Sequence, residues 1–159
     1  MSTLRQTGLL LVLSLCSTFG LAQFDTRAPS GLENRALGNP SPLPLAQAFP
    51  FYVSETGPNQ LRVTWTPAAG HYLYRHAFHF SLQSEAAGEL QELRVTLPAG
   101  LAKTDQFFGA IEAYYNSVSV DLLLPPATAT GTVLLIQYQG CADWGFCYPP
   151  QRESFAVHP

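Results

Sequence analysis

The sequence predicts an all-β fold, and in particular an immunoglobulin-like β-sandwich, from three observations. Short runs of alternating polar and apolar residues recur between turn residues, which is typical of half-buried strands. No convincing long amphipathic helix interrupts them. Thirteen Pro and twelve Gly, against one Met and one Lys, also fit a protein of strands and turns. The 159 residues predict one domain with its own core.

Seven strands are expected along the chain. In residues 60–66 the alternation places Leu61, Val63 and Trp65 on one face. Six further runs alternate in the same way or are rich in β-forming residues: 49–55, 71–83, 90–97, 113–124, 131–139 and 147–157. Turn residues separate the runs, at Gly57-Pro58, Ala69-Gly70, Pro98, Pro125-Pro126 and Gly131. Seven short strands with regular turns indicate an immunoglobulin-like sandwich.

The first 22 residues are typical of a cleavable secretory signal peptide. Arg5 supplies a positive start, an apolar run follows, and small residues precede an expected cleavage after Ala22. The run has about 14 residues, fewer than the roughly 20 that cross a bilayer. The alternative is a lipoprotein anchored at Cys16, but Leu15 stands where a small residue is expected. After export, residues 23–45 are expected to form a leader or linker and residues 46–159 the folded domain.

The charge of the chain argues against a nucleic-acid partner. Only 12% of the residues are charged, and the formal net charge is −3. Binding to nucleic acid rests on lysines and arginines that neutralise phosphates, and no basic stripe is present. We therefore expect no nucleic-acid partner.

Two cysteines, Cys141 and Cys147, remain after removal of the signal peptide. In an oxidising compartment an even number of cysteines favours a disulfide. The two residues lie near the facing ends of an expected hairpin, where paired Cα atoms are about 4.5–5.5 Å apart and within disulfide range. The plainest interpretation is a structural staple, which contributes about 2.4 kcal/mol across so short a loop.

Metal ions and cofactors are not expected. The C-x5-C spacing lacks the paired C-x2-C of structural zinc sites, and it is not the C-x-x-C of thioredoxin. On a regular strand His71 and His79 would lie about 27 Å apart, too far to share an ion.

Residues 98–112 form the longest stretch without a clear period, and we expect an irregular loop there. Loops of this length tend to be functional or disordered. Its middle, Asp105-Gln106-Phe107-Phe108-Gly109, places two large aromatic side chains beside a glycine. On burial grounds alone Phe107 and Phe108 are expected to fold back and plug the end of the sandwich.

The cysteine segment resembles the active-site segment of the N-terminal periplasmic domain of the bacterial DsbD family of thiol:disulfide interchange proteins. Both cysteines, their spacing, the Gly-Phe before the second and the Tyr-Pro-Pro after it agree. The resemblance covers about residues 45–157. Further matches occur in the same order, at Gln47-Ala48-Phe49 with Phe51, at Gly70-His71-Tyr72-Leu73-Tyr74-Arg75, and at Asp105-Gln106-Phe107-Phe108-Gly109.

The resemblance implies an immunoglobulin-like sandwich that relays electrons in the periplasm, as a protein-disulfide reductase or thiol-disulfide oxidoreductase domain. Cys147 would form the mixed disulfide with partners, and Cys141 would resolve it. Residues 105–109 would be a cap that shields the cysteines until a partner displaces it, which replaces the plug expected from burial. The domain is expected to be a monomer.

The resemblance also implies the partners. Electrons would come from a separately encoded thioredoxin-like or membrane donor, because the family protein continues into a membrane domain and a thioredoxin-like domain that this sequence does not contain. They would go to periplasmic thioredoxin-fold proteins, such as a disulfide isomerase and a thioredoxin-like protein of cytochrome c maturation. A stand-alone subunit and a fragment of a longer protein both remain open.

Four further residues are candidates for the surroundings of the cysteines: Tyr72, Tyr74, Asp105 and Asp143. A nearby carboxylate disfavours a thiolate and would hold the pair quiet until a partner docks. A solvated carboxylate or a packed tyrosine is the open alternative for each. Gln106 departs from an acid of the family's cap, and Trp144 from a small residue. The alternative function is a non-catalytic secreted binding module with a structural disulfide.

Overall fold

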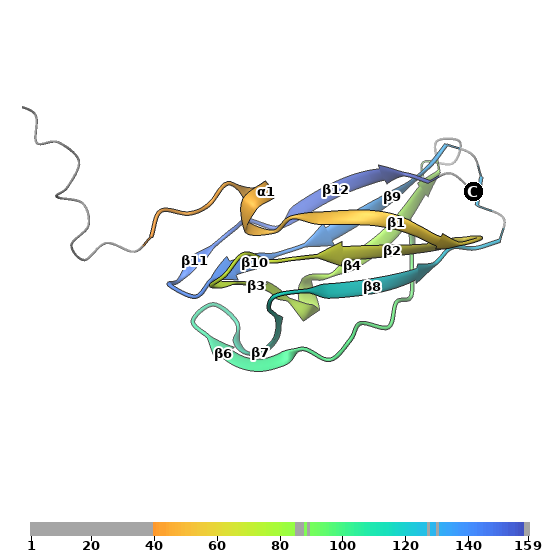
Figure 1. The fold of residues 1–159 in the computed structure, drawn as a ribbon. Helices are drawn as coiled ribbons and strands as arrows, with labels where there is room; N and C mark the ends of the chain where they lie inside the picture. The colour runs from red at the N-terminus through yellow and green to blue at the C-terminus, as the bar shows by residue number, and fades with distance from the viewer. Residues whose placement is uncertain (1–39, 85–87, 89, 127, 130, 158–159) are drawn as a thin grey trace, which may run out of the picture. The chain divides into compact units, whose positions relative to one another are not determined.

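The computed structural model describes residues 40–84, 88, 90–126, 128–129 and 131–157, and they fold almost entirely as β-strands (Figure 1). The expected signal peptide and the expected leader up to residue 39 lie outside these residues. In the remainder of that leader, Leu43 packs against the core, as does Leu45 at the start of the short helix α1 (Leu45–Ala48). Among the described residues no helix is long and apolar enough to span a membrane.

Three antiparallel sheets are present among the described residues. The first has the order β1-β2-β8, formed by β1 (Phe51–Gly57), β2 (Gln60–Trp65) and β8 (Val118–Leu123). The second has the order β12-β9-β4-β5, formed by β12 (Gln151–Ala156), β9 (Thr132–Tyr138), β4 (His79–Ser84) and β5 (Leu90–Glu92). The third has the order β11-β10-β3-β7-β6, formed by β11 (Phe146–Cys147), β10 (Gly140–Ala142), β3 (His71–Tyr74), β7 (Gly109–Tyr114) and β6 (Leu101–Asp105).

The first two sheets bury the main core between them, and the predicted β-sandwich is confirmed. The predicted face of β2 is buried, with Leu61, Val63 and Trp65 at most 3% exposed. Trp65 lies at the centre of an aromatic cluster, stacked on Phe51 and edge-on to Phe78. Burying large apolar side chains in this way is the main force that holds the sheets together.

The third sheet extends one end of the sandwich and carries the cysteines. β9 is followed after one residue by β10, and β3 is followed by a 3-10 turn, η2 (Arg75–Ala77), that leads into β4 (Figure 1). Strand β3 is buried on both faces. Leu73 points into the main core, whereas Tyr72 and Tyr74 belong to a second cluster with Cys141. The sandwich therefore fixes two tyrosines beside a cysteine.

Three of the expected strands are interrupted, and a fourth is shorter than predicted. Residues 71–83 are broken by η2, residues 113–124 by the gap between β7 and β8, and residues 147–157 by Pro149-Pro150. Only residues 90–92 of the run 90–97 are a strand. At all three breaks the chain leaves one sheet and enters another, and a period-two pattern does not reveal which sheet a residue joins. The prolines lack the N–H that a ladder needs.

The expectation of an irregular loop at residues 98–112 is wrong, because most of these residues form the β6–β7 hairpin. Asp105 pairs with Gly109 across a three-residue turn, and Gly109 has a φ of +71°. β6 is the edge strand of its sheet and has no buried residue, with Leu101 64% exposed. A strand without a buried face needs no alternation of polar and apolar residues, so the sequence pattern missed it.

Gly140, the residue before Cys141, lies so close to its neighbours that a side chain does not fit there. A Cβ atom at this position would lie 2.5 Å from the Phe49 ring and 2.6 Å from the carbonyl oxygen of Tyr72. Phe49 is buried and the carbonyl belongs to the sheet, so neither yields easily. We expect Gly140→Ala to lower the free energy of unfolding by about 1–3 kcal/mol, measured by urea denaturation of the oxidised protein.

Gly57→Ala is the matched control, because a Cβ there would lie 3.6 Å from Gln60, an ordinary contact. We expect it to leave the urea midpoint close to that of the wild type. A Gly140→Ala protein as stable as the Gly57→Ala protein would contradict this account of the close approach.

Candidate functional site

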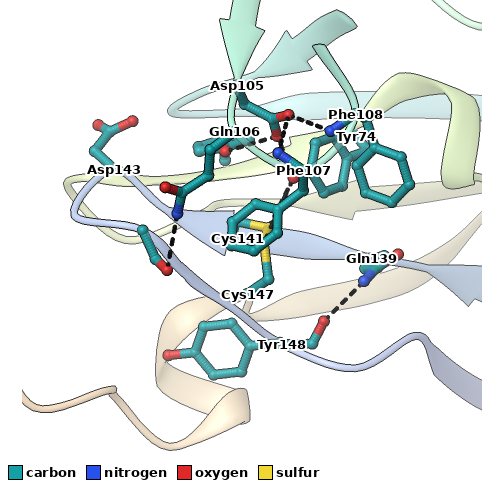
Figure 2. Close-up of a disulfide and its surroundings, with 12 residues drawn as sticks. Tyr74, Asp105, Gln106, Phe107, Phe108, Gln139, Cys141, Asp143, Cys147 and Tyr148 are labelled. Atoms are coloured by element: carbon teal, nitrogen blue, oxygen red, sulfur yellow. Dashed lines mark hydrogen bonds between the residues drawn. A yellow bond between two sulfur atoms is a disulfide. The ribbon is translucent and has the colours of Figure 1, made fainter.

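Cys141 and Cys147 form a disulfide between the paired strands β10 and β11, with their Cα atoms 4.0 Å apart (Figure 2). The turn Asp143-Trp144-Gly145 joins the strands, and we call residues 142–146 the cysteine turn. Gly145 has a φ of +91°, which a side chain would disfavour. Cys141 is fully buried, whereas Cys147 is partly exposed on the edge strand. Of the two, Cys147 is therefore the more accessible.

The Tyr74 hydroxyl joins the disulfide to the cap. It lies 2.9 Å from Cys141 Sγ and 3.5 Å from Cys147 Sγ, and it donates a hydrogen bond to the Asp105 carboxylate. The Tyr72 hydroxyl donates to the same carboxylate oxygen at 3.2 Å. Burial and the adjacent Asp105 raise the pKa of Tyr74, so this phenol stays neutral and keeps its proton.

Asp105 holds the cap turn from within. Its Oδ1 accepts the backbone N–H groups of Phe107 at 3.0 Å and Phe108 at 2.7 Å. Burial alone would raise the pKa of Asp105, but hydrogen bonds from Tyr74 and the two amides outweigh it, and the pKa is lowered. The carboxylate is therefore ionised at neutral pH and accepts bonds from both the sheet and the cap.

The two cap phenylalanines do not enter the core. Phe107 is 48% and Phe108 51% exposed, so the expectation that they plug the end of the sandwich is wrong. Phe108 packs edge-on against Tyr74 at 4.9 Å and against His76 at 5.0 Å. The phenylalanines turn outward because β6 and β7 form a hairpin at the sheet edge, outside the space between the two main sheets.

Gln106 links the tip of the cap to the cysteine turn. Its Nε2 donates to the carbonyl oxygen of Gly145 at 3.3 Å (Figure 2). An ionised acid at this position has no proton to donate to a carbonyl, whereas an amide has two. The departure at Gln106 thus creates a contact between the two turns.

Asp143 is paired with two residues that the sequence analysis missed. Its Oδ1 accepts a hydrogen bond from Lys103 Nζ at 2.8 Å and from the Tyr115 hydroxyl at 2.6 Å. Burial raises the pKa of Asp143, but Lys103 and Tyr115 outweigh that effect and the pKa is lowered. The one signal in the sequence is that Lys103 is the only lysine, two residues before Asp105.

Trp144, the second residue that differs from the family pattern, packs inward. Its ring lies edge-on to that of His71 at 4.9 Å and within 3.5 Å of where a Cβ of Gly70 would stand. A cavity of about 290 Å³ lies between the cap and the cysteine turn, lined by Tyr72, Lys103, Thr104, Asp105, Gln106, Phe107, Ala142, Asp143, Trp144 and Gly145. Within the described residues no group of three His, Cys, Asp or Glu side chains is placed to hold a metal ion.

These features define a β-sandwich domain with a disulfide at one sheet edge, beneath a hairpin cap. The family model of the N-terminal domain of the thiol:disulfide interchange protein DsbD matches residues 39–159. The chain belongs to this family, as the sequence resemblance predicts.

The curated relatives are longer proteins. The chain is 32% identical over 154 residues to the thiol:disulfide interchange protein DsbD 1 of Pseudomonas aeruginosa, covering 97% of this chain and 25% of that protein. It is 36% identical over 151 residues to DsbD of Citrobacter koseri, covering 95% of this chain and 24% of that protein. The chain thus spans about a quarter of the length of these relatives.

Solved structures show the same fold. The crystal structure of the Neisseria meningitidis DsbD N-terminal domain in the reduced form superposes with a TM-score of 0.61 at 28% identity, covering 74% of this chain and 90% of that one. The DsbD N-terminal domain in its complex with the PilB N-terminal domain, from the same organism, has a TM-score of 0.57 at 24% identity, covering 74% and 92%. The second match supports the fold alone.

Asp105→Ala is expected to open the cap without unfolding the domain. The substitution removes the acceptor for the Phe107 and Phe108 amides, and a hydrogen bond to a charged group contributes about 1.5–3 kcal/mol. Amide hydrogen exchange at both residues should become about tenfold faster or more. Asp121→Ala is the control, because Asp121 pairs with Arg62 on the first sheet. Unchanged exchange in the Asp105 variant would contradict the role of this carboxylate.

Proposed function

We propose that this domain carries out thiol:disulfide exchange in the periplasm, relaying electrons through the Cys141–Cys147 pair. One observation supports this most directly: the disulfide lies at a sheet edge under a cap, with one cysteine fully buried and the other partly exposed. A cap held by a few polar contacts can leave and return. A disulfide with only a structural role does not require a cap that can be displaced.

The exchange follows from this asymmetry. In the reduced domain, the Cys147 thiolate attacks a sulfur of a partner's disulfide, a mixed disulfide forms, and one partner thiolate leaves. Cys141 then loses its proton and attacks the Cys147 sulfur, which releases the second partner thiolate. Two electrons pass to the partner, whose two thiolates take up protons, and the domain ends with the disulfide seen in the structure. The Tyr74 hydroxyl lies 2.9 Å from Cys141 Sγ, so it would donate a hydrogen bond to the resolving thiolate once its single proton turns from the Asp105 carboxylate to the sulfur.

Thioredoxin-fold proteins of the periplasm are the proposed partners, among them a disulfide isomerase and a thioredoxin-like protein of cytochrome c maturation. Membership of the family of DsbD N-terminal domains supports this. A thioredoxin-like or membrane donor on a separate chain or domain would supply the electrons. The cap would turn aside when such a partner docks, exposing Cys147.

The reduction potential of the pair distinguishes exchange from a structural staple. Structural disulfides of secreted proteins lie below about −300 mV, whereas exchange catalysts lie above this value. We expect the Cys141–Cys147 pair to equilibrate with glutathione buffers at a potential above about −300 mV, measured by thiol labelling. A lower value would favour the binding module with a structural disulfide.

Partner trapping tests the roles of the two cysteines. Cys141→Ser leaves Cys147 free but unable to be resolved, so it should accumulate mixed disulfides with thioredoxin-fold proteins on non-reducing gels. Cys147→Ser is the matched control, because it leaves only the buried thiol, and we expect it to trap little. Equal trapping by both variants would overturn the assignment of Cys147 as the attacking residue.

A further inference from the structure

We propose that Lys103 is a positioning residue for this exchange: its ammonium pairs with Asp143 in the cysteine turn and so lets the Cys147 thiolate form at lower pH. The inference rests on the proposed function and concerns the same pair of cysteines. It assigns a role to the one lysine of the chain.

The position of the ammonium is well defined. Lys103 Nζ donates to Asp143 Oδ1 at 2.8 Å and to the Tyr115 hydroxyl at 2.9 Å, and it lies 4.4 Å from the centre of the Tyr72 ring. Its side chain is 25% exposed. A lysine loses much rotational freedom when it is held in this way, and three favourable contacts offset that loss. Lys103 and Asp143 therefore form a well-defined ion pair that joins the β6–β7 hairpin to the cysteine turn.

The charges around the cysteines explain why the pair matters. Two carboxylates belong to the site: Asp105 is linked to the sulfurs through the Tyr74 hydroxyl, and Asp143 lies in the turn that joins the two cysteines. Among the described residues of the site, Lys103 is the basic side chain that pairs with one of these carboxylates, Asp143. Arg75 pairs with Glu112 instead. The other titratable groups of the elements packed here are Tyr72, Tyr74, His76, Tyr115, His71 and Tyr148.

An unpaired Asp143 would oppose a thiolate at Cys147 by like-charge repulsion. Because Lys103 Nζ lies 2.8 Å from Asp143 Oδ1, the two charges largely cancel at greater distances, and the repulsion of a thiolate is weakened. The same ion pair also ties β6 to the cysteine turn, so its loss could instead loosen the cap. These two effects fall on different measurable quantities: repulsion moves the pH midpoint of thiol alkylation, whereas loosening raises the plateau rate at high pH.

The test is the pH dependence of iodoacetamide alkylation at Cys147 in the reduced protein, followed by peptide mass spectrometry. Lys103→Met should raise the midpoint by about half to one pH unit. Asp143→Asn should lower it, and the double variant, which has the net charge of the wild type, should return it towards the wild-type value. Lys103→Arg should stay close to the wild type. Opposite shifts in the two single variants support the proposal.

Two results would overturn it. If both single variants raise the plateau and leave the midpoint in place, the ion pair is a mechanical link only. If both move the midpoint in the same direction, the charge of Lys103 does not act through Asp143. Failure of the proposed function is a separate result, because it would appear in the wild-type protein as a potential below about −300 mV and an absence of trapped partners.

A second measurement does not depend on how a variant folds. Because Lys103 is the only lysine, acetylation of the wild-type protein in its disulfide form, followed by reduction, removes the charge of a single side-chain amine and leaves both thiols unmodified. We expect the protein acetylated at Lys103, identified by peptide mass spectrometry, to show the same upward shift of the midpoint as Lys103→Met. An unchanged midpoint after complete acetylation would contradict the proposal.

Discussion

The hydroxyl of Tyr74 is the contact on which the arrangement of this domain depends. It touches both sulfur atoms of the disulfide and donates to the Asp105 carboxylate, which in turn holds the cap. Tyr74 is fully buried on a strand whose neighbouring residue, Leu73, belongs to the main core. The packing of the sandwich therefore sets the position of the Tyr74 hydroxyl. This hydroxyl contacts both the disulfide and Asp105 of the cap.

The balance of forces in the cap differs from that in the core. The core is held by burial of large apolar side chains around Trp65, which cannot leave without great cost. The cap phenylalanines are about half exposed, so their burial contributes only part of what a core aromatic does. Polar contacts at Asp105 and Gln106 supply the rest. A cover closed mainly by a few hydrogen bonds can exchange them for contacts with a docking protein.

Sequence patterns predicted the parts of the fold that have a buried face. The alternation in residues 60–66 placed Leu61, Val63 and Trp65 correctly, because β2 has one face towards the core. The same argument failed for the β6–β7 hairpin, which lies at an exposed edge. It also failed where the chain changes sheets, as at η2, because local periodicity carries no information on the strand order.

Prediction of the site was limited in a similar way. The pairing of Cys141 with Cys147 follows from two neighbouring strands and a short turn, so local reasoning was enough. The pairing of Lys103 with Asp143 joins residues 40 positions apart, and it forms although the sheet order β11-β10-β3-β7-β6 places β6 and β11 at opposite edges. No local pattern contains that order, and the only available signal was the rarity of lysine.

The edge of the third sheet explains why the site is built from two hairpin turns. An exposed sheet edge normally invites pairing with another chain, and proteins usually blunt it. Here β11 is only two residues long and ends at Cys147, so the edge offers a sulfur and little backbone to a second protein. The β6–β7 turn reaches this region through Asp105, which accepts from Tyr74, and through Gln106, which donates to the Gly145 carbonyl. The contacts of Asp105 and Gln106 therefore join the β6–β7 turn to the part of the sheet that carries the disulfide, and both turns contribute to the site.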